Sequence, residues 1–393
     1  MTLVAAALVL FSLACLGLMH FSHRAVTSSP RPDVPGRLPP VSILKPLKDA
    51  DAGLADNLRS VFRQAYPDYE VILGTVEADD PALRVAWRVA AEHRGVHSVI
   101  VAGGAVPGAN PKVANLSNLA RHARHSLLLV SDSNLDVPSD HLRDLVAHRA
   151  RAGGGLVWSL FRGVRESGLG GLLEAVQLNV YMAGGACLLR HVLRIPSAVG
   201  KSMLVDREDL LPIGGLPALS PFLAEDHVCA EELAALGRPI TLCGHPVDNV
   251  LGPRSLGDFL SRQLRWSRIR RQVSLGGHLS ELLLNPVLLA LVAAVALRTP
   301  VALAGAGLTL AAASVLDALA ERRLGIRRPL LLYPLLELPL SLLRGAIWGA
   351  ALFGRTLVWR GNRIRIGKRT RIESRGAPAR VEPFVPAQRR ASA

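Results

Sequence analysis

The sequence predicts an α/β domain built on a largely parallel sheet, with a membrane anchor before it and membrane helices after it. Three observations predict this class. Short apolar stretches alternate with helical patterns between residues 41 and 272, the first 19 residues are almost wholly apolar, and two long apolar runs follow residue 281. Alternating strands and helices are typical of parallel sheets whose two faces are both covered.

The composition indicates contact with a membrane surface or with phosphate. Half of the 393 residues are hydrophobic, only 4% are aromatic, and the formal net charge is +15. We expect no nucleic-acid partner, because the positive charge is concentrated beside the apolar segments, where anionic lipid would attract it. The cysteines lie far apart without metal-ligand spacing, which is typical of a reducing compartment: Cys15, Cys187, Cys229 and Cys243.

The N-terminal segment is predicted to be a retained anchor, residues 1–22. Thr2–Met19 is apolar, and the basic residue Arg24 follows it, whereas a signal peptide carries its positive charge before the apolar run. The positive-inside rule then places the segment after the anchor in the cytosol. Residues 23–40, rich in Pro and Ser, are expected to form a linker.

The C-terminal membrane region is predicted to cover residues 276–359. Leu282–Leu297 and Val301–Ala320 are joined by a link of three residues, which favours a helical hairpin. A third run, Pro329–Trp359, is interrupted by Pro334, Glu337, Pro339, Arg344 and Gly345 and has basic residues on both flanks. Because both flanks are expected in the cytosol, we predict a re-entrant or broken helix here, with an ordinary third helix as the alternative. Residues 360–393 are expected to be a basic cytosolic tail.

The domain between these segments, residues 41–275, is predicted from its alternating pattern. Its expected strands are Val41–Leu44, Tyr69–Thr75, Val96–Val101 and Ser126–Val130. Its expected helices are Asn57–Gln64, Pro81–His93 and Pro111–Ala123. Ligands of such sheets bind beyond the carboxyl ends of the strands. Asp80 and Asp132, which follow strand ends, are therefore candidate site residues.

Two acidic clusters have both a structural and a functional interpretation. Asp80 precedes Pro81 and is well placed to cap a helix. Asp132-Ser133-Asn134 is consistent with an Asx-turn that closes a strand. The same motif suits a divalent cation that joins carboxylates to a diphosphate, since hard cations prefer oxygen ligands.

Two further clusters lie later in the chain. Glu225-Asp226-His227 begins a predicted helix, Asp226–Leu236, where an acidic pair is either a cap or a general base. Arg262, Arg265 and Trp266 open a basic stretch that continues through Arg271. That stretch fits a helix lying on anionic lipid, and its arginines also suit phosphate binding.

Together the four clusters resemble the inverting GT-A glycosyltransferases, and most closely their ceramide glucosyltransferase branch. That pattern is three separated aspartates followed by Gln/Arg-x-x-Arg-Trp, here Asp80, Asp132, Asp226 and Arg262–Trp266. Further similar stretches are Val41–Lys48, Tyr66–Val71, Gly103-Gly104, Gly108–Lys112 and Trp359–Arg365. The resemblance implies a nucleotide-diphospho-sugar transferase fold of Rossmann-like type.

The resemblance also implies a role for each matching residue. Asp80 would contact the uridine of the donor, and Asp132 would bind its diphosphate through Mg²⁺ or Mn²⁺. Asp226 would be the catalytic base. Arg265 and Trp266 would serve the leaving group and the acceptor, while Lys112 and Arg262 are expected near the donor. Asn134 stands where the family pattern has a second aspartate, so it would offer the metal only a carbonyl oxygen.

We therefore expect an inverting transferase that moves a hexose from a UDP-sugar, with UDP-glucose first, onto a membrane lipid. Ceramide is the first acceptor by resemblance, and a hopanoid glycosylated from UDP-N-acetylglucosamine is the alternative. A polysaccharide synthase uses the same motifs but generally needs more membrane helices, and a non-catalytic scaffold would not need all four clusters. The expected location is the cytosolic face of a membrane, with a bacterial inner membrane first.

Overall fold

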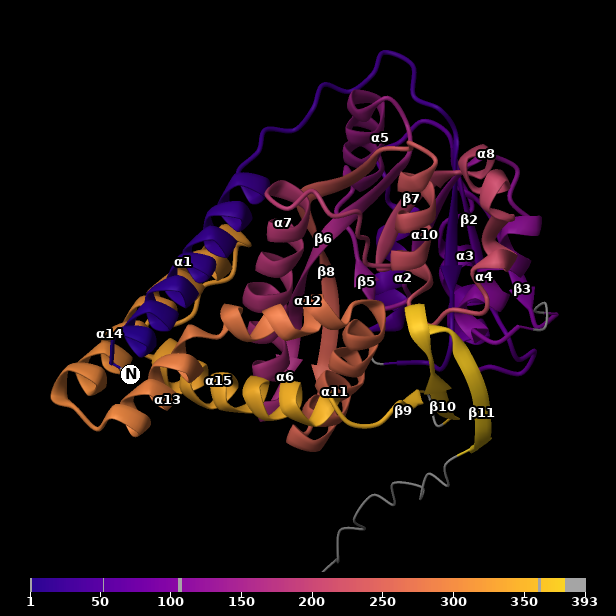
Figure 1. The fold of residues 1–393 in the computed structure, drawn as a ribbon. Helices are drawn as coiled ribbons and strands as arrows, with labels where there is room; N and C mark the ends of the chain where they lie inside the picture. Colours follow the sequence, from indigo (N-terminus) through magenta and orange to yellow (C-terminus); the bar gives the residue numbers. More distant parts are fainter. Residues whose placement is uncertain (1, 52, 105–107, 360–361, 379–393) are drawn as a thin grey trace, which may run out of the picture.

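The computed structural model describes residues 2–51, 53–104, 108–359 and 362–378. It has an α/β domain, a group of helices packed beside that domain, and a small second sheet formed by the C-terminal residues (Figure 1). The predicted fold class is confirmed: the domain is α/β, and long apolar helices lie at the N-terminus and in the C-terminal region.

The main sheet has eight strands in the order β3-β2-β1-β4-β7-β6-β8-β5. The first four strands run parallel, β7 is antiparallel to both neighbours, and β6 pairs parallel with β8. The predicted strands are β1 (Val41–Pro46), β2 (Tyr69–Thr75), β3 (His97–Ala102) and β4 (Leu127–Ser131). The sequence analysis did not identify β5 (Leu135–Asp136), β6 (Leu156–Ser167), β7 (Ser202–Asp206) or β8 (Ile240–Pro253).

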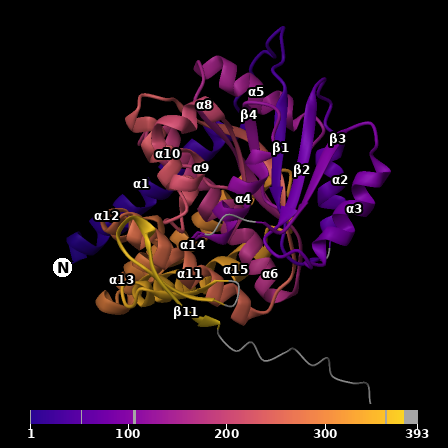
Figure 2. The same ribbon diagram turned by 90° about the vertical axis from the view of Figure 1, so that its right-hand side faces the viewer.

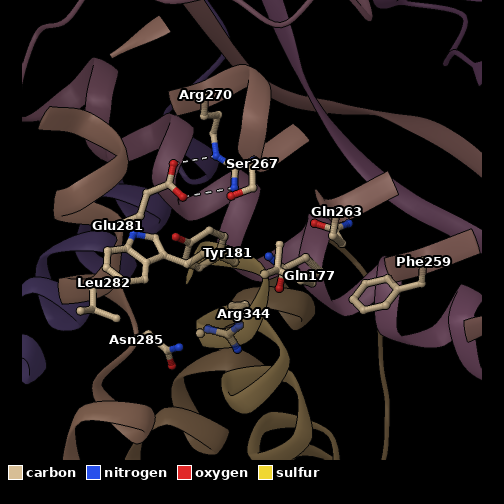
Figure 3. Close-up of a pocket in the computed structure, with 13 residues that line it drawn as sticks. Gln177, Tyr181, Phe259, Gln263, Ser267, Arg270, Glu281, Leu282, Asn285 and Arg344 are labelled. Atoms are coloured by element: carbon tan, nitrogen blue, oxygen red, sulfur yellow. Dashed lines mark hydrogen bonds and ion pairs between the residues drawn. The ribbon is translucent and has the colours of Figure 1, made fainter. Parts of the chain in front are cut away.

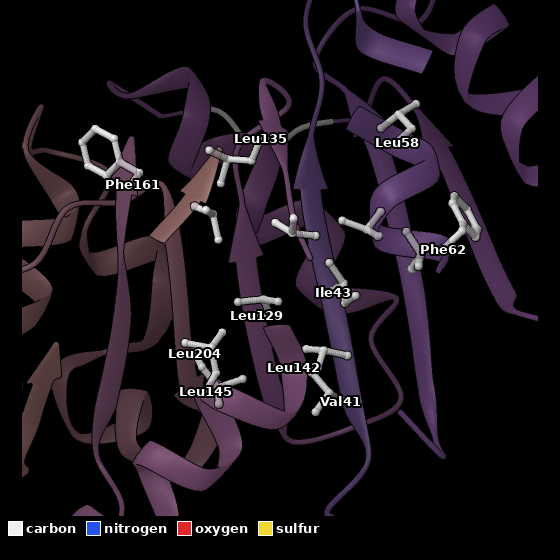
Figure 4. Packing of buried hydrophobic residues seen from close by; sticks show 14 of the residues in the cluster. Val41, Ile43, Leu58, Phe62, Leu129, Leu135, Leu142, Leu145, Phe161 and Leu204 are labelled. Carbon is white, nitrogen blue, oxygen red and sulfur yellow. The ribbon is translucent and has the colours of Figure 1, made fainter. Parts of the chain in front are cut away.

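Helices cover both faces of this sheet because its strands carry apolar side chains on both faces. Val41 and Ile43 of β1 belong to one core and Leu44 to the other. The first core, with Ile43, Leu129 and Leu204 at its centre, is shown in Figure 4. It packs under α2 (Leu54–Phe62), α3 (Ala82–Glu92) and α5 (His141–Ala152), whereas α4 (Pro111–Arg121) and α10 (Glu225–Ala235) cover the other face.

A long apolar helix follows β6 and was not expected from the sequence. It consists of α6 (Gly168–Val176), a π-helical segment (Gln177–Met182) and α7 (Ala183–His191). Its length and hydropathy would allow it to cross a membrane, yet about two-thirds of it is buried inside the protein. Short helices α8 (Arg207–Leu210) and α9 (Gly215–Ala218) then connect β7 to α10.

The N-terminal helix α1 (Thr2–Thr27) packs against the later apolar helices. Leu16 and Met19 share a buried cluster with Leu188 of α7, Val287 of α13 and Ala313 of α14. The predicted hairpin is present as α13 (Pro286–Leu297) and α14 (Pro300–Arg323). Its first arm is shorter than expected, because α12 (Leu275–Ser280) and the turn at Glu281–Leu284 meet α13 at an angle of 71°.

The expectation of a broken helix within Pro329–Trp359 is wrong. Leu332–Ala351 forms one continuous helix, α15, which contains Pro339 and packs against α14 and against α11 (Leu256–Val273) (Figure 1). Pro334 lies in the first turn, where a proline is tolerated. Glu337 is buried but accepts hydrogen bonds from Ser341 and Arg344, so neither charge forces the chain to turn back.

Part of the predicted basic tail, residues 360–393, is folded: residues 362–378 pack onto the domain, whereas residues 360–361 and 379–393 lie outside the described residues. β10 (Asn362–Ile366) pairs with β9 (Thr356–Trp359) and β11 (Ile372–Pro378) in an antiparallel sheet. Ile364 and Ile366 are buried against Leu223, which precedes α10. The basic stretch forms strands because its apolar residues Ile364 and Ile366 alternate toward a common core.

Residues on both flanks of the Pro329–Trp359 segment contact the α/β domain. Arg328 pairs with Glu166 of β6, and the backbone N–H of Leu223 donates to Thr370 (3.1 Å). We therefore predict that cysteines placed at the exposed positions Arg327 and Ser374 label from the same side of sealed vesicles. Labelling of the two positions from opposite sides would identify α15 as an ordinary transmembrane helix.

Candidate active site

The site begins at the carboxyl end of β4, in the middle of the sheet. Asp132 is the first residue after β4, and its carboxylate meets two ammonium groups. Lys112 Nζ lies 3.0 Å from one oxygen and Lys201 Nζ lies 3.1 Å from the other. Asp132 therefore holds together α4 and the segment just before β7.

Lys112 is held at the N-terminal end of α4 by a local cap. Asn110 accepts hydrogen bonds from the backbone N–H groups of Lys112 (3.0 Å) and Val113 (3.4 Å), which fixes the first turn. The ammonium group of Lys112 also lies 3.1 Å from Glu225 and donates to the carbonyl of Gly200 at 2.9 Å. Three oxygens from three separate segments thus surround one positive charge.

The electrostatics of this cluster favour its charged form. Burial alone would lower the pKa of Lys112, but the carboxylates of Asp132, Glu225 and Asp226 raise it above its ordinary value. Burial would raise the pKa of Asp132, but Lys112 and Lys201 bring it down to about 2. Asp132 is therefore ionised, and negatively charged, throughout the neutral pH range.

Asp226 and Glu225 are neighbours in sequence but differ in their surroundings. Glu225 is buried; it pairs with Lys112 and accepts a hydrogen bond from Asn110 at 3.1 Å, and burial raises its pKa. Asp226 is half-buried and accepts backbone N–H groups from Gly200 and His227. Of these two carboxylates, Asp226 is the more exposed, and its carboxylate forms no ion pair with a lysine among the described contacts. Asp226 is therefore the better candidate for a general base.

Helix α11 (Leu256–Val273) brings the arginine motif to the same place. Arg262 pairs with the buried Glu174 of α6 (2.8 Å) and lies over the ring of Trp266 at 4.7 Å. Its charge acts on both Asp132 and Lys201, which places it beside the cluster. Arg265 is half-buried on the same helix, and Trp266 packs against the main core.

Asp80 has the structural role that the cap interpretation predicted. Its carboxylate accepts the backbone N–H of Ala82 at 2.9 Å and that of Asp49 at 3.0 and 3.2 Å. It lies at the same edge of the sheet as Asp132 but two strands away, since β1 separates β2 from β4. Asp80 therefore fixes the loop after β1, and a contact with the uridine remains a prediction.

Asn134 is engaged by other side chains. Its carbonyl oxygen accepts from Lys201 (3.0 Å), and its amide donates to Asn249 (2.8 Å). The sequence analysis missed Lys201 and Gly200 because they lie in a segment between elements that it did not identify. It also missed Lys45, which is fully buried on β1 and lies 3.3 Å from Ser131 Oγ.

A second group of potential ligands lies between α5 and β8. His148, Cys243 and His245 each place one ligand atom within 4.8 Å of the others. No local motif marks this group, since Cys243 lies 95 positions after His148 along the chain. His245 also lies 3.4 Å from Asp144, which in turn contacts Arg31.

The fold and the sheet-edge carboxylates define a GT-A glycosyltransferase. A solved mannosyltransferase from Pyrobaculum calidifontis, in complex with GDP-Man and Mn²⁺, has the same fold. It superposes with a TM-score of 0.50 and 22% identity, over 88% of this chain and 97% of that one.

The chain belongs to glycosyl transferase family 21, whose model matches residues 2–372. Ceramide glucosyltransferase 3 of Caenorhabditis elegans is 29% identical over 242 residues, which is 59% of this chain and 51% of the relative. Ceramide glucosyltransferase of Pyricularia oryzae is 22% identical over 67% of this chain and 65% of the relative. The chain thus spans about half to two-thirds of the length of these relatives. The predicted enzyme class, a glycosyltransferase of the ceramide glucosyltransferase branch, is confirmed.

Gly200 gives a direct test of this geometry. A β-carbon at this position would lie 3.0 Å from Asp226 and 3.1 Å from the ammonium group of Lys112. We predict that Gly200→Ala displaces both groups and lowers sugar transfer by about 100-fold, since small displacements of reacting groups are costly. The control is Gly185→Ala in α7, where a β-carbon meets nothing within 4 Å. Equal activity of the two variants, measured at equal thermal stability, would contradict the assignment.

Proposed function

We propose that the protein is an inverting glycosyltransferase that moves a hexose from a UDP-sugar onto a hydroxyl group of a membrane lipid. UDP-glucose and ceramide are the first donor and acceptor. The observation that carries this proposal is the half-exposed Asp226 carboxylate beside the lysine cluster of Asp132, next to the arginine-bearing α11. The names of the relatives support the acceptor class.

The acceptor hydroxyl is a weak nucleophile and needs a base. Asp226 is placed to take its proton as the oxygen attacks the anomeric carbon. The backbone N–H of Gly200 donates a hydrogen bond to the carboxylate and orients it. The structure offers no second free carboxylate at this position among the described contacts, since Glu225 and Asp132 are both paired with Lys112. A single displacement with inversion follows.

The leaving diphosphate needs positive charge. Lys112 and Lys201 lie on either side of Asp132, and Arg262 is close enough to influence it. These groups would stabilise the negative charge that grows on the leaving oxygen more than they stabilise the bound donor. Arg265 and Trp266, on the same helix as Arg262, are proposed to contact the leaving group and the acceptor.

The oxygen atoms gathered at this site also suit a divalent cation. Asp132, Asn134, Glu225 and the carbonyl of Gly200 are all oxygen ligands, and three of these oxygens already surround the Lys112 ammonium group. Asp132 and Asn134 are proposed to hold Mg²⁺ or Mn²⁺. When bound, the metal would neutralise the diphosphate as it departs. Lys112 and Lys201 would then turn from Asp132 toward the phosphate oxygens.

A lipid acceptor explains the helices packed beside the domain. Among the described residues, three helices are long and apolar enough to cross a membrane, judged by length and composition. A long-chain lipid leaves the bilayer at a cost of about 0.8 kcal/mol for each exposed CH₂ group. An active site beside membrane helices avoids that cost. The active site is proposed to face the cytosol, where nucleotide sugars are available, on a bacterial inner membrane.

Purified protein assayed with several UDP-sugars, each offered to ceramide and to a hopanoid polyol, tests this function. We expect transfer to a lipid acceptor, and we expect Asp226→Asn to lower it by about 100- to 10,000-fold while UDP-sugar binding persists. Asp68→Asn, an exposed change at the start of β2, is the control. Near-normal turnover of Asp226→Asn would refute the base, and no transfer to either lipid would refute the acceptor class.

The metal assignment has its own test. Asp132→Ala is expected to weaken the binding of UDP in the presence of Mg²⁺ or Mn²⁺, measured by calorimetry, and to reduce its dependence on the metal. The substitution removes a metal ligand, and it also leaves Lys112 and Lys201 without their shared partner. The expected loss of UDP affinity therefore combines these two effects. Full wild-type activity in excess chelator would show that the reaction needs no divalent metal.

A further inference from the structure

The cavity between the π-helical segment, α11 and α15 is too small to be a ligand site. Arg270 and Glu281 pair at its wall (Figure 3), and its volume of about 30 Å³ admits about one or two water molecules. The group between α5 and β8 is different in kind. His148, Cys243 and His245 are all side chains that bind transition metals, and they lie together.

This group is presented by two elements that pack against each other, α5 and β8. On α5, Asp144 and His148 are four positions apart, so they lie on the same side of the helix. On β8, Cys243 and His245 lie where the register with β6 is irregular, and such bulges redirect side chains. Each element therefore supplies two potential ligands to the space between them.

The distances between these side chains are close to those of a tetrahedral zinc site. Zn–S bonds of about 2.3 Å and Zn–N or Zn–O bonds of about 2.0–2.1 Å hold ligand atoms about 3.3–3.6 Å apart. Nδ1 of His245 lies 3.4 Å from Oδ2 of Asp144 and 3.9 Å from Sγ of Cys243. One nitrogen of His148 lies within 4.8 Å of the sulfur and of the His245 ligand atom, so a small side-chain movement brings it into bonding range.

His148 has a buried nitrogen that lacks a partner. The residue is only 1% exposed, and its Nε2 has no hydrogen-bond partner among the described residues. Nδ1 faces Arg151 at 3.4 Å, so Nε2 is the nitrogen left for a ligand. Buried polar groups are normally satisfied, and a metal ion would satisfy this one. Arg151 is exposed, so it can turn into solvent when metal binding places the ring proton on Nδ1.

The neighbours of the group orient two of its members. Asp144 also pairs with Arg31 (3.3 Å), and the ring of His245 forms a hydrogen bond with the backbone of Ser29. Metal-binding imidazoles and carboxylates commonly have such outer partners, which fix their orientation. Arg31 and Ser29 belong to the segment after α1, which passes beside α5 (Figure 1 and Figure 2). The side chain of His245 is 21% exposed, which gives an ion a path from solvent.

We propose that His148, Cys243 and His245, with Asp144 as the fourth ligand, form a structural zinc site. One sulfur and two imidazole nitrogens favour Zn²⁺ over Mg²⁺ or Ca²⁺, which prefer oxygen ligands. Binding releases the thiol proton of Cys243 to solvent. Four protein ligands leave no open position for a substrate, as is usual in structural sites. The ion joins α5 to β8 and, through Arg31, secures the segment that leads from α1 to the sheet.

The zinc site is separate from the site proposed for the donor metal. Cys243 precedes Asn249 by six positions on β8, and Asn249 contacts Asn134 beside Asp132. Six residues of extended strand span roughly 20 Å. The two sites therefore bind their metals independently, and the zinc proposal does not depend on the sugar-transfer function.

Elemental analysis of tag-free, full-length protein, purified with Zn²⁺ and dialysed against zinc-free buffer, tests the site. We expect about one zinc ion per chain in the wild type. Cys243→Ala and His148→Ala are each expected to weaken zinc binding by more than about 100-fold, which exceeds the usual loss for an outer partner. Cys187→Ala removes another buried thiol and is the control. It should keep the zinc, and so should Asp132→Ala.

Cobalt substitution provides a measurement that does not depend on the folding of a variant. Co²⁺ added to metal-free wild type should give a thiolate-to-metal charge-transfer band that Zn²⁺ removes, and Zn²⁺ should raise the melting temperature. Absence of zinc or of the thiolate band in the wild type, retention of zinc in Cys243→Ala, or loss of zinc in Asp132→Ala would overturn the proposal. Zinc bound at Cys243 in a protein that transfers sugar to no lipid would support the site and refute only the proposed function.

Discussion

The whole site depends on one electrostatic constraint, the neutralisation of several carboxylates that the fold crowds at the end of β4. Asp132 follows β4, whereas Glu225 and Asp226 begin α10, and the repulsion between these carboxylates would separate the two segments. The ammonium groups of Lys112 and Lys201 remove that repulsion, and the charges in turn keep Lys112 protonated. A donor diphosphate offers the lysines an alternative partner, so substrate binding and the arrangement of the carboxylates are coupled.

The C-terminal strands hold the segment that carries the proposed base. The backbone N–H of Ala224 donates to Thr370 Oγ1, the backbone N–H of Ile372 donates to Pro221, and Arg369 pairs with Glu231 and Glu232 of α10. Residues 362–378 therefore fix the entry to α10 from outside the main sheet. This explains how a basic stretch far along the chain influences the position of Asp226.

The membrane helices are joined to the α/β domain by buried polar contacts as well as by apolar packing. Glu321, near the end of α14, accepts hydrogen bonds from Asn179, Arg328 and Tyr333 at 2.8–2.9 Å. Such a fully satisfied network fixes one arrangement of its members. The position of α14 and α15 relative to the π-helical segment is thereby defined.

The sequence by itself determined the class of fold and the residue types of the site. The strands β1–β4, the helices between them, and Asp132, Asp226 and Arg262 all follow from local pattern and motif, since hydrophobic alternation and short motifs depend on neighbouring residues. Only the tertiary structure decided which charges meet. Lys201 joins Asp132 across 69 positions, Gly200 joins Asp226 across 26 positions, and residues 362–378 fold back onto the domain. It also gave α15 as one continuous helix, because Arg344 and Ser341 satisfy Glu337. These contacts join residues far apart in the chain, and a local pattern carries no information on such pairs.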